Sequence, residues 1–341
     1  MKEIKIFTNL DKGFNEKNCL PIKVLLKRFN GKMVNSFENS KIIIDFIKRK
    51  SDNYFNLKNK VFLIIGGDNL FFKKNLFSYF ESFLHKIIGK NKYKIIDFFD
   101  AIIPKKISQF PTGSFFSEYD KIIKDVRIGK KKNVFFILTN SIKGKNFISI
   151  PLFIQVYFDK IKKLVNKKIP SEKEIKNKKF CVFVVSSNSS RERVDFFRML
   201  SRYKKVDSYG KVMNNMGEKE FENDWPTNSE LFKKYKFVIC FENSFAEDYI
   251  TEKLLNAMFA NSIPIYRGAP NVKKYFNTKS FINFDDYGSY DKMIKKIIEL
   301  DNDDNKYKEF FKKPWFKNNM VPDKIKNTET ELIKFYRKRL K

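Results

Sequence analysis

Four polar side chains in the C-terminal half of the chain have types and spacing suited to binding a nucleotide. Tyr249, Glu252, Lys253 and Asn256 lie at positions i, i+3, i+4 and i+7, which predicts that they share one face of a helix. The helix N-terminus and the lysine ammonium would attract phosphates, and the glutamate carboxylate would accept hydrogen bonds from sugar hydroxyls. The alternative interpretation is a solvated helix face that carries one weak ion pair.

Arg193 predicts a second positive charge at the same place. It lies near the start of a charged helix that is expected to begin at Arg191, after the apolar run Phe180–Ser186. If the two strand-to-helix turns are neighbours, Arg193 and Lys253 would hold a diphosphate between them. A surface arginine without such a role is the alternative.

The elements around these residues alternate between buried strands and helices. The expected strands are Phe180–Ser186, the segment closed by Val206–Gly210, Phe237–Phe241, Ile263–Tyr266 and Phe281–Phe284. A last helix is expected at Tyr290–Leu300, with Ser289 as its N-cap. This order predicts a doubly wound parallel sheet whose ligands lie beyond the carboxyl ends of the strands.

The first half of the chain shows a weaker pattern of the same kind. Strand-like runs occur at Ile4–Phe7, Val61–Ile65, Ala101–Ile103, Ile122–Ile123 and Val134–Leu138, with helical stretches at Ile22–Phe29 and Phe77–Ile88. The 341 residues are too many for one core, so an α/β protein of two domains is expected. The predicted divisions are a domain at 1–165, a Lys-rich linker at 166–179, a domain at 180–315 and a basic C-terminal helix or tail at 316–341.

The composition favours an anionic partner and disfavours metal chemistry. Seventy basic and 39 acidic residues give a net charge of +31, but the excess is mostly lysine, which argues against base readout by guanidinium forks. The single histidine, His85, lies in an aromatic-rich helical stretch, and Cys19, Cys181 and Cys240 are interpreted as buried thiols. Asp301–Asp304 lacks the glycine and distal glutamate of a calcium loop and is interpreted as a solvated turn between helices.

The sequence contains no apolar run near the roughly 18 residues that a membrane helix needs. Its first residues lack the apolar core of a secretion signal, so a cytoplasmic protein is expected. The basic surface, with the C-terminal Phe335–Lys341, is expected to allow peripheral contact with anionic lipid at the inner membrane face. A frayed, solvated helix end is the alternative.

The residues around Lys253 resemble a known family. The run Lys236–Gly268 (KFVICFENSFAEDYITEKLLNAMFANSIPIYRG) is similar to the signature of the α1,3/4-fucosyltransferases, glycosyltransferase family 10, with FENS, Y-[VI]-TEK and IP-[IV]-Y-x-G in this order. The runs FVVSSNSSRERVDFFRML and KKVDSYG, together with Ala269–Phe284 and Tyr307–Trp315, resemble further blocks of that family. The resemblance covers roughly residues 180–315.

The resemblance implies a GT-B fold, with two Rossmann-like doubly wound domains that face each other across a crevice. It implies GDP-β-L-fucose as the donor in the second domain, an acceptor sugar bound mainly by the first domain, and neither a cofactor nor a metal. By position, Arg193 and Lys253 would hold the diphosphate, and Asn243 and Tyr249 would contact the donor. Glu252 would bind donor hydroxyls and stabilise the cation-like sugar, and Asn256 completes the expected donor-binding set.

The general base that the family requires is harder to place. The family uses the glutamate of a GEN-type motif, followed some thirty residues later by an arginine and PLY, and here Ile150–Phe153 resembles the PLY block with Ser149 in place of the arginine. Counting back leads to Asp125 as the catalytic base. Asp68, in IIGGDN, resembles GEN more closely but comes much earlier in the chain. A third possibility is that neither carboxylate serves.

The function expected from these residues is that of an enzyme, an inverting α1,3-fucosyltransferase. It would move L-fucose from GDP-fucose to a hydroxyl of a GlcNAc- or glucose-containing oligosaccharide or glycolipid, as in lipopolysaccharide or protein glycosylation. The alternatives are a GT-B transferase with another nucleotide sugar, an inactive homologue, and a Lys-rich nucleic-acid-binding protein. Nucleic acid is not expected as a partner.

Overall fold

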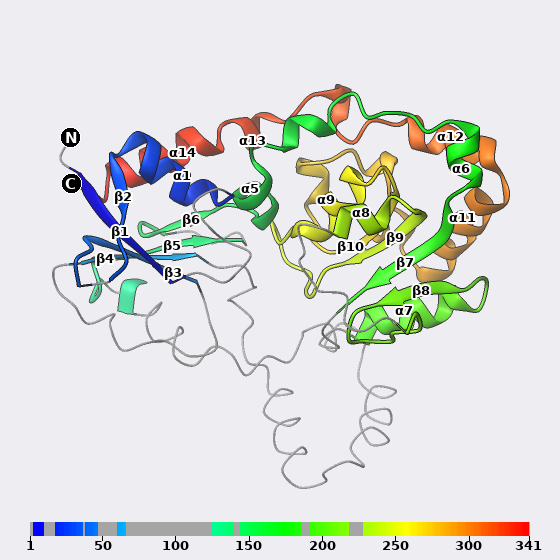
Figure 1. Cartoon of the computed structure of the whole chain (residues 1–341), viewed down its shortest axis with the longest axis horizontal. Coiled ribbons are helices and arrows are strands. Elements are labelled where there is room, and N and C mark those ends of the chain that lie inside the picture. The colour runs from blue at the N-terminus through cyan, green and yellow to red at the C-terminus, as the bar shows by residue number, and fades with distance from the viewer. Residues whose placement is uncertain are drawn as a thin grey trace, which may run out of the picture.

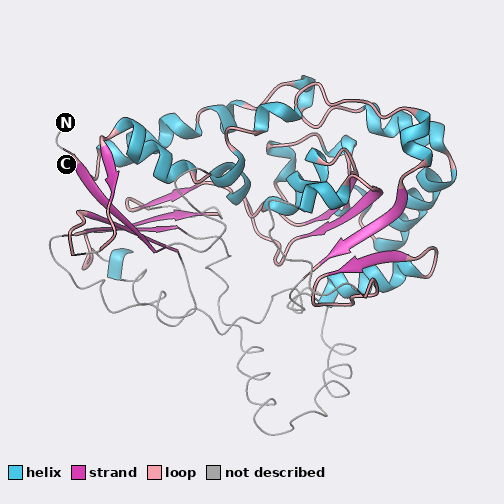
Figure 2. Cartoon of the chain, viewed as in Figure 1, coloured by secondary structure: helices cyan, strands magenta, loops and turns pink. Residues whose placement is uncertain are grey.

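The computed structural model describes residues 3–9, 18–36, 38–46, 60–65, 125–127, 129–139, 144–185, 191–217 and 228–340. Within these ranges the chain forms two parallel β-sheets, each with helices packed against it (Figures 1 and 2). The predicted α/β class is therefore confirmed. His85, Asp68, the two expected strands Ala101–Ile103 and Ile122–Ile123, and the expected helix Phe77–Ile88 lie outside the described residues.

The first sheet has the strand order β2-β1-β3-β4-β5-β6, and every described pair is parallel. Its strands are β1 (Ile4–Asn9), β2 (Gly31–Met33), β3 (Ile42–Phe46), β4 (Val61–Ile65), β5 (Val134–Leu138) and β6 (Phe147–Ser149). Helices α1 (Leu20–Arg28) and α5 (Leu152–Tyr157) follow β1 and β6 in the chain. The three predicted strands that fall on described residues and the predicted helix at Ile22–Phe29 are confirmed.

The second sheet has the order β11-β10-β9-β7-β8 and is also parallel throughout. Its strands are β7 (Lys179–Val184), β8 (Val206–Tyr209), β9 (Tyr235–Phe241), β10 (Ile263–Arg267) and β11 (Ile282–Asn283). Its helices are α7 (Arg191–Ser201), α8 (Asn228–Phe232), α9 (Glu252–Phe259), α10 (Phe284–Tyr287), α11 (Tyr290–Asn302) and α12 (Asp304–Lys312). Strands β9 and β10 are buried at every position, as expected for the centre of a sheet covered on both faces.

The chain passes between the two domains twice. The segment after α5 contains a short 3-10 helix at Ile161–Leu164 and helix α6 (Glu172–Lys176), which begins with a capping box between Ser171 and Glu174. After α12 the chain returns through α13 (Asp323–Lys326) to α14 (Thr328–Arg337) on the first domain, so that both ends of the chain lie there (Figure 1). Tyr336 is 2% exposed, and its hydroxyl donates to the Pro21 carbonyl at 3.1 Å.

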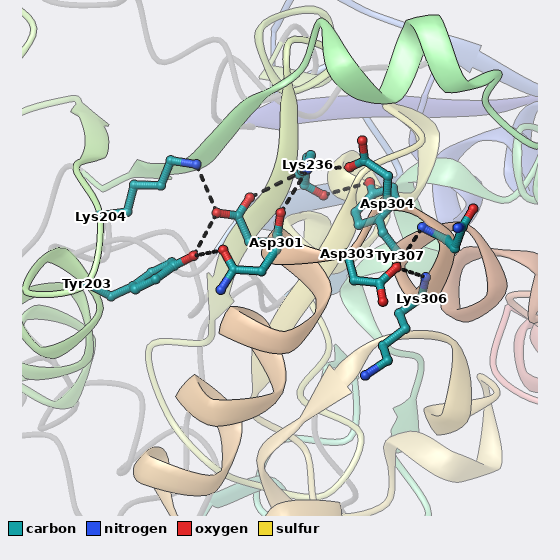
Figure 3. Close-up of polar contacts among 10 residues, drawn as sticks. Tyr203, Lys204, Lys236, Asp301, Asp303, Asp304, Lys306 and Tyr307 are labelled. Atoms are coloured by element: carbon teal, nitrogen blue, oxygen red, sulfur yellow. Dashed lines mark hydrogen bonds and ion pairs between the residues drawn. The ribbon is translucent and has the colours of Figure 1, made fainter.

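The acidic run Asp301–Asp304 joins α11 to α12, and Figure 3 shows its polar contacts with residues of other elements. The Asp301 side chain is 2% exposed, and its Oδ2 accepts hydrogen bonds from Lys204 Nζ at 2.9 Å and the Tyr203 hydroxyl at 3.1 Å. Lys236, on β9, lies 2.9 Å from Asp304. The expectation of a solvated turn between helices is therefore wrong for Asp301 alone, which is buried as a counter-charge of Lys204 and of Lys236 on a central strand, whereas Asn302 is exposed and Asp303 and Asp304 are half-buried.

The remaining sequence-based interpretations concern the thiols and membrane helices. Cys19, Cys181 and Cys240 are free and buried, as expected. Burial raises the pKa of the Cys19 thiol to about 12, so it remains protonated. None of the helices in the described ranges has the length and apolar character required to cross a bilayer.

Candidate functional site

Glu242 organises the carboxyl edge of the second sheet. It follows β9 directly, its side chain is fully buried, and its N–H donates to the Arg267 carbonyl of β10 at 2.8 Å. Its carboxylate accepts two hydrogen bonds from Thr251, from the backbone N–H at 2.8 Å and from the hydroxyl at 2.6 Å. The loop 243–250 is therefore closed back onto the strand end, and Thr251 is fixed as the N-cap of α9.

Lys253 completes this cluster as a buried ion pair. Its Nζ lies 3.4 Å from Glu242 Oε2 and 3.3 Å from Glu252 Oε1, and it donates to the Thr251 hydroxyl at 3.0 Å. Burial lowers the pKa of Lys253, but the carboxylates of Glu252 and Glu242 outweigh it and the pKa is raised overall. Burial also raises the pKa of Glu242, against the opposing effect of Lys253. The ammonium therefore stays charged and is 24% exposed.

Arg193 brings the second cation to the same cluster. It lies in the first turn of α7, is 2% exposed, and its Nη1 donates to Asn243 Oδ1 at 2.6 Å. Burial lowers the pKa of Arg193, with Tyr249 and Glu242 opposing this effect, and the charge of Arg193 in turn contributes to lowering the pKa of Lys253. The two predicted cations thus converge from the turns after β7 and β9.

The predicted helical face does not form in full. Helix α9 begins at Glu252, so Tyr249 lies before it, in a turn where its N–H donates to the Ala246 carbonyl at 3.1 Å. Asp248 takes a left-handed conformation with φ of 64°, which ends any helical path between the two segments. Tyr249 therefore reaches the cluster from the loop.

Asn256 belongs to a contact between the domains. It is 2% exposed, and its Oδ1 accepts a hydrogen bond from the Tyr157 hydroxyl of α5 at 2.8 Å. Beside it, the Phe153 N–H of α5 donates to the Ile250 carbonyl at 3.2 Å. The structure thus places Asn256 one helical turn beyond Lys253 and holds it against the first domain.

A second buried pair flanks the cluster. Arg267, 8% exposed at the end of β10, pairs with Glu192 at 2.9 Å and donates to the Tyr290 hydroxyl. Its guanidinium lies 4.2 Å from the ring centroid of Phe284 and 4.4 Å from that of Phe245. The sequence analysis gave no role to Glu192 or to Glu242. The position of Glu242, directly after a buried strand, was the signal that could have identified it.

The structure does not bring Asp125 to this cluster. Asp125 lies in a helical turn that precedes β5, and its carbonyl accepts the N–H of Lys130 at 2.8 Å. The adjacent Arg127 guanidinium lies 5.8 Å from the ring centroid of Phe147, the first residue of β6. Asp125 is therefore at the amino-terminal edge of the first sheet, whereas ligands of such sheets bind at the carboxyl edge. The other candidate base, Asp68, is outside the described residues.

The described residues contain no group of three or more His, Cys, Asp or Glu side chains arranged to hold a metal ion. The cluster instead offers two cations, two carboxylates, an amide and a phenol at a sheet edge. These groups have the chemistry to bind an anionic ligand that also carries hydroxyl groups.

Comparison with known proteins places the second domain in a family. Residues 173–337 match the family "Glycosyltransferase family 10 (fucosyltransferase) C-term". The chain is 35% identical over 147 residues to a putative fucosyltransferase of Acanthamoeba polyphaga mimivirus, covering 41% of this chain and 24% of that protein. It is 37% identical over 128 residues to the alpha-(1,3)-fucosyltransferase FucT of Helicobacter pylori, covering 38% of this chain and 26% of that protein.

The similarity extends to a human enzyme and, in fold, to solved structures. The chain is 35% identical over 141 residues to human 4-galactosyl-N-acetylglucosaminide 3-alpha-L-fucosyltransferase 9, covering 40% of this chain and 37% of that protein. It thus spans about a quarter to a third of the length of these relatives. The crystal structure of an alpha1,3-fucosyltransferase with GDP-fucose matches 99% of this chain and 90% of that chain, with 20% identity and a TM-score of 0.60.

A ligand-free structure of an alpha1,3-fucosyltransferase gives a TM-score of 0.62 at 18% identity. These likenesses cover both parallel-sheet domains and confirm the predicted GT-B fold. Residues 173–337, slightly less than half of the chain, are therefore similar to the C-terminal domain of glycosyltransferase family 10, the fucosyltransferase family.

Proposed function

We propose that this chain is a GDP-fucose-dependent, inverting α1,3-fucosyltransferase. Its acceptor would be a GlcNAc- or glucose-containing oligosaccharide or glycolipid. The observation that carries the proposal is the convergence of Arg193 and Lys253 at the carboxyl edge of the second sheet, together with the buried carboxylate of Glu242 that holds Lys253. The family match and the relatives named as fucosyltransferases support the donor sugar.

In this proposal the two cations stabilise the departing diphosphate of GDP. The bond between the fucose anomeric carbon and the phosphate oxygen breaks as a bond to the acceptor oxygen forms on the opposite face, and a carboxylate takes the acceptor hydroxyl proton. Fixed positive charge on the leaving group lowers the barrier without a metal ion. Asn243 and Tyr249 contact the donor, and Glu252 accepts hydrogen bonds from the fucose hydroxyls.

Asp125, Asp68 and a base other than these two remain the alternatives. Asp125 precedes β5, at the amino-terminal edge of the first sheet, and Asp68 lies outside the described residues. If Asp68 is the base, D68N loses turnover by 100-fold or more, on the order of a general-base contribution, while D125N remains within a few-fold of the native rate.

Release of GDP from GDP-fucose in the presence of N-acetyllactosamine tests the proposed reaction. We expect turnover in the native protein and very little in Lys253→Ala or Glu252→Gln, because charge stabilisation of the leaving group or of the sugar is lost. Lys292→Ala is the matched control, since Lys292 is an exposed lysine on α11. Equal turnover in all four proteins would refute the assigned roles.

The donor nucleotide is tested separately by thermal shift with GDP, UDP and CMP. A ligand at a hundred times its Kd stabilises the native state by about 2.7 kcal/mol, so the nucleotide that the protein binds raises the Tm measurably. GDP alone should do so, and Arg193→Ala should abolish the shift. A larger shift with UDP or CMP would indicate another donor. Cytoplasmic location and contact with an anionic membrane remain part of the proposal.

A further inference from the structure

A lysine-rich groove lies on the C-terminal connection, and none of its lining residues belongs to the cluster around Lys253. It has a volume of about 610 Å³ and is bounded by the 3-10 helices Val272–Lys274 and Lys317–Asn319 and by α13. This connection crosses from α12 toward α14 along the upper edge of the molecule in Figure 1. Its charged lining residues are Lys273, Lys274, Lys317, Lys324, Lys326 and Asp323.

Three of these lysines form no ion pair with another described residue, although Lys273 is near enough to Asp285 to contribute to lowering the pKa of that carboxyl. Lys324 pairs with Asp248 at 3.2 Å and Lys326 with Asp323 at 3.3 Å. Lys273, Lys274 and Lys317 are exposed and form no ion pair with any other described residue. The five lysines of the groove outnumber the nearby carboxylates of Asp248, Asp323 and Asp285, so the groove presents a net positive field to solvent.

The same groove has an exposed apolar centre. Met320, which lines it, is 59% exposed, the largest exposed fraction among the exposed large apolar side chains of the described residues. Val321 and Pro322 beside it are half-buried. An apolar side chain surrounded by lysines is the pattern of an interfacial surface, in which the cations pair with phosphates and the apolar group enters the headgroup layer.

The C-terminal segment, where the sequence placed membrane contact, is less suited to that role. Phe335 is 6% exposed and Tyr336 2% exposed, and both pack on the first domain, where Phe335 contacts the Phe135 ring edge-on at 6.2 Å. Its apolar groups are therefore already used within the fold. A single-stranded nucleic acid is also a poor occupant of the groove, because its aromatic residues Tyr275 and Phe276 are each 1% exposed and leave no face for base stacking.

We propose that this groove docks the protein on an anionic lipid bilayer. Lys273, Lys274 and Lys317 contact lipid phosphates, and Met320 inserts among the headgroups. The proposal rests on the charge and exposure of the groove. It assigns a surface to the membrane contact of the proposed function, does not depend on the donor or the reaction, and would bring a glycolipid acceptor near the enzyme.

Sedimentation with vesicles tests the proposal on the full chain. The probes are phosphatidylcholine vesicles with and without about one third phosphatidylglycerol, a content that gives the vesicle a negative surface potential. We expect binding only to the anionic vesicles, lost in high salt. K273E/K274E should weaken it at least about tenfold, and Met320→Ser by about threefold, since both headgroup pairing and insertion contribute.

The matched control is K292E/K295E, which changes the net charge equally at two exposed lysines of α11. Urea unfolding without ligand verifies that each variant is folded, so this test does not depend on the donor proposal. If both double variants weaken vesicle binding equally, binding depends on the overall charge of the protein and not on the groove, and the proposal is overturned. Equal binding to neutral vesicles, or binding to an RNA oligonucleotide in preference to anionic vesicles, would overturn the lipid assignment.

Discussion

Glu242 shows how one buried carboxylate can order a site that it does not need to enter. It is hydrogen-bonded to both donors of Thr251 and paired with Lys253, so it fixes the N-cap and the first turn of α9 together. Gly268 leaves room for it, since a Cβ there would lie 2.6 Å from Glu242 Cγ. The role of Glu242 in the site is therefore to position Thr251 and Lys253.

Removing the partner of Glu242 should therefore be costly in a pH-dependent way. In Lys253→Met, the Glu242 carboxylate stays buried without its counter-charge, and we expect the free energy of unfolding to fall by about 3 kcal/mol at pH 7.5. Burial raises the pKa of Glu242 in the folded protein above its value in the unfolded chain. The stability that Glu242 contributes is therefore present below the unfolded-state pKa and is lost as pH rises through the folded-state pKa. The difference in unfolding free energy between the native protein and Lys253→Met should thus become smaller toward pH 4.5. Urea unfolding at several pH values measures it.

The double variant E242Q/K253M provides the control for this prediction. The amide keeps the size of the side chain but cannot be ionised, so its stability should exceed that of K253M at pH 7.5 and depend less on pH. If K253M is as stable as the native protein at pH 7.5, the pair contributes no net electrostatic stabilisation.

Lys167 is a second residue whose charge conflicts with its surroundings. Its Nζ lies 3.5 Å from the ring centroid of Trp315 and 4.2 Å from that of Phe311, and among the described residues it has no hydrogen-bond partner. Burial lowers the pKa of Lys167 to about 7. The two aromatic faces favour the cation, but the loss of hydration outweighs that attraction.

We expect Lys167→Met to be more stable than the native protein by ~2 kcal/mol at pH 7, because burial of the charge is removed. Between pH 7 and the ordinary lysine value the unfolded chain binds the proton and the folded chain does not. The native protein therefore gains stability as pH rises, and the two proteins should converge near pH 10. Urea unfolding at both pH values measures this. Lys163→Met, at an exposed lysine, should show no such convergence.

At the scale of elements, helices α5 and α9 connect the two domains beside the candidate site. Tyr157 of α5 bonds Asn256 one turn beyond Lys253, and Phe153 packs its ring against Tyr275 at 5.6 Å. The first domain thus helps to fix the helix that carries Lys253. Tyr157 and Asn256 act in this interpretation as positioning residues.

Tyr157→Phe should test that interpretation, because it removes one hydrogen bond and keeps the ring. The Asn256 amide oxygen then loses the hydrogen bond from Tyr157, so we expect a loss of about 1 kcal/mol of stability. We also expect kcat to fall several-fold while KM for GDP-fucose changes little. Steady-state kinetics and urea unfolding are the measurements.

The double variant Y157F/N256L makes both partners apolar. It should regain stability relative to Y157F, since replacing both partners of a hydrogen bond by apolar groups costs less than removing one of them. If Asn256 also contacts the donor, as the sequence suggested, the double variant would instead raise KM for GDP-fucose strongly. These outcomes separate a positioning role from a binding role.

The elements themselves were largely predictable from the sequence. Continuous apolar runs identified β7, β9 and β10 to within about two residues, and Ser289 caps α11 as expected, accepting the Lys292 N–H at 3.3 Å. These features depend on local pattern and capping chemistry, which the sequence states directly. The same holds for the convergence of Arg193 and Lys253, which follows from parallel topology.

The sequence-based predictions that were wrong concerned features set by contacts between residues far apart in the chain. Helical spacing placed Tyr249 on α9, but the two bonds from Thr251 to Glu242 set the helix start at Glu252. The acidic run at Asp301 looked solvated because its partner Lys236 lies 65 residues earlier. Periodicity describes one segment at a time, so it cannot reveal a counter-charge from another strand.

At the scale of the whole molecule, the C-terminal helix joins the two domains by returning to the first. Tyr336 of α14 packs edge-on against Phe29 at 5.7 Å, and Arg28 pairs with Glu329 at 3.2 Å. The last residues of the family domain therefore complete the core of the other domain. Stability of the first domain should depend on a segment that follows the second.

Tyr336→Ala should destabilise the first domain selectively. Loss of a buried aromatic side chain costs about 3–5 kcal/mol, and here the cavity would open between α14 and α1. In calorimetry we expect the unfolding of the first domain to shift to lower temperature while GDP still raises the Tm of the second. Tyr336→Phe, which removes only the bond to Pro21, should cost about 1 kcal/mol, and Lys338→Ala, at an exposed lysine, nothing measurable. A single transition that moves as one unit, with GDP stabilising all of it equally, would show instead that α14 and the contact between α5 and α9 make the two domains one cooperative structure.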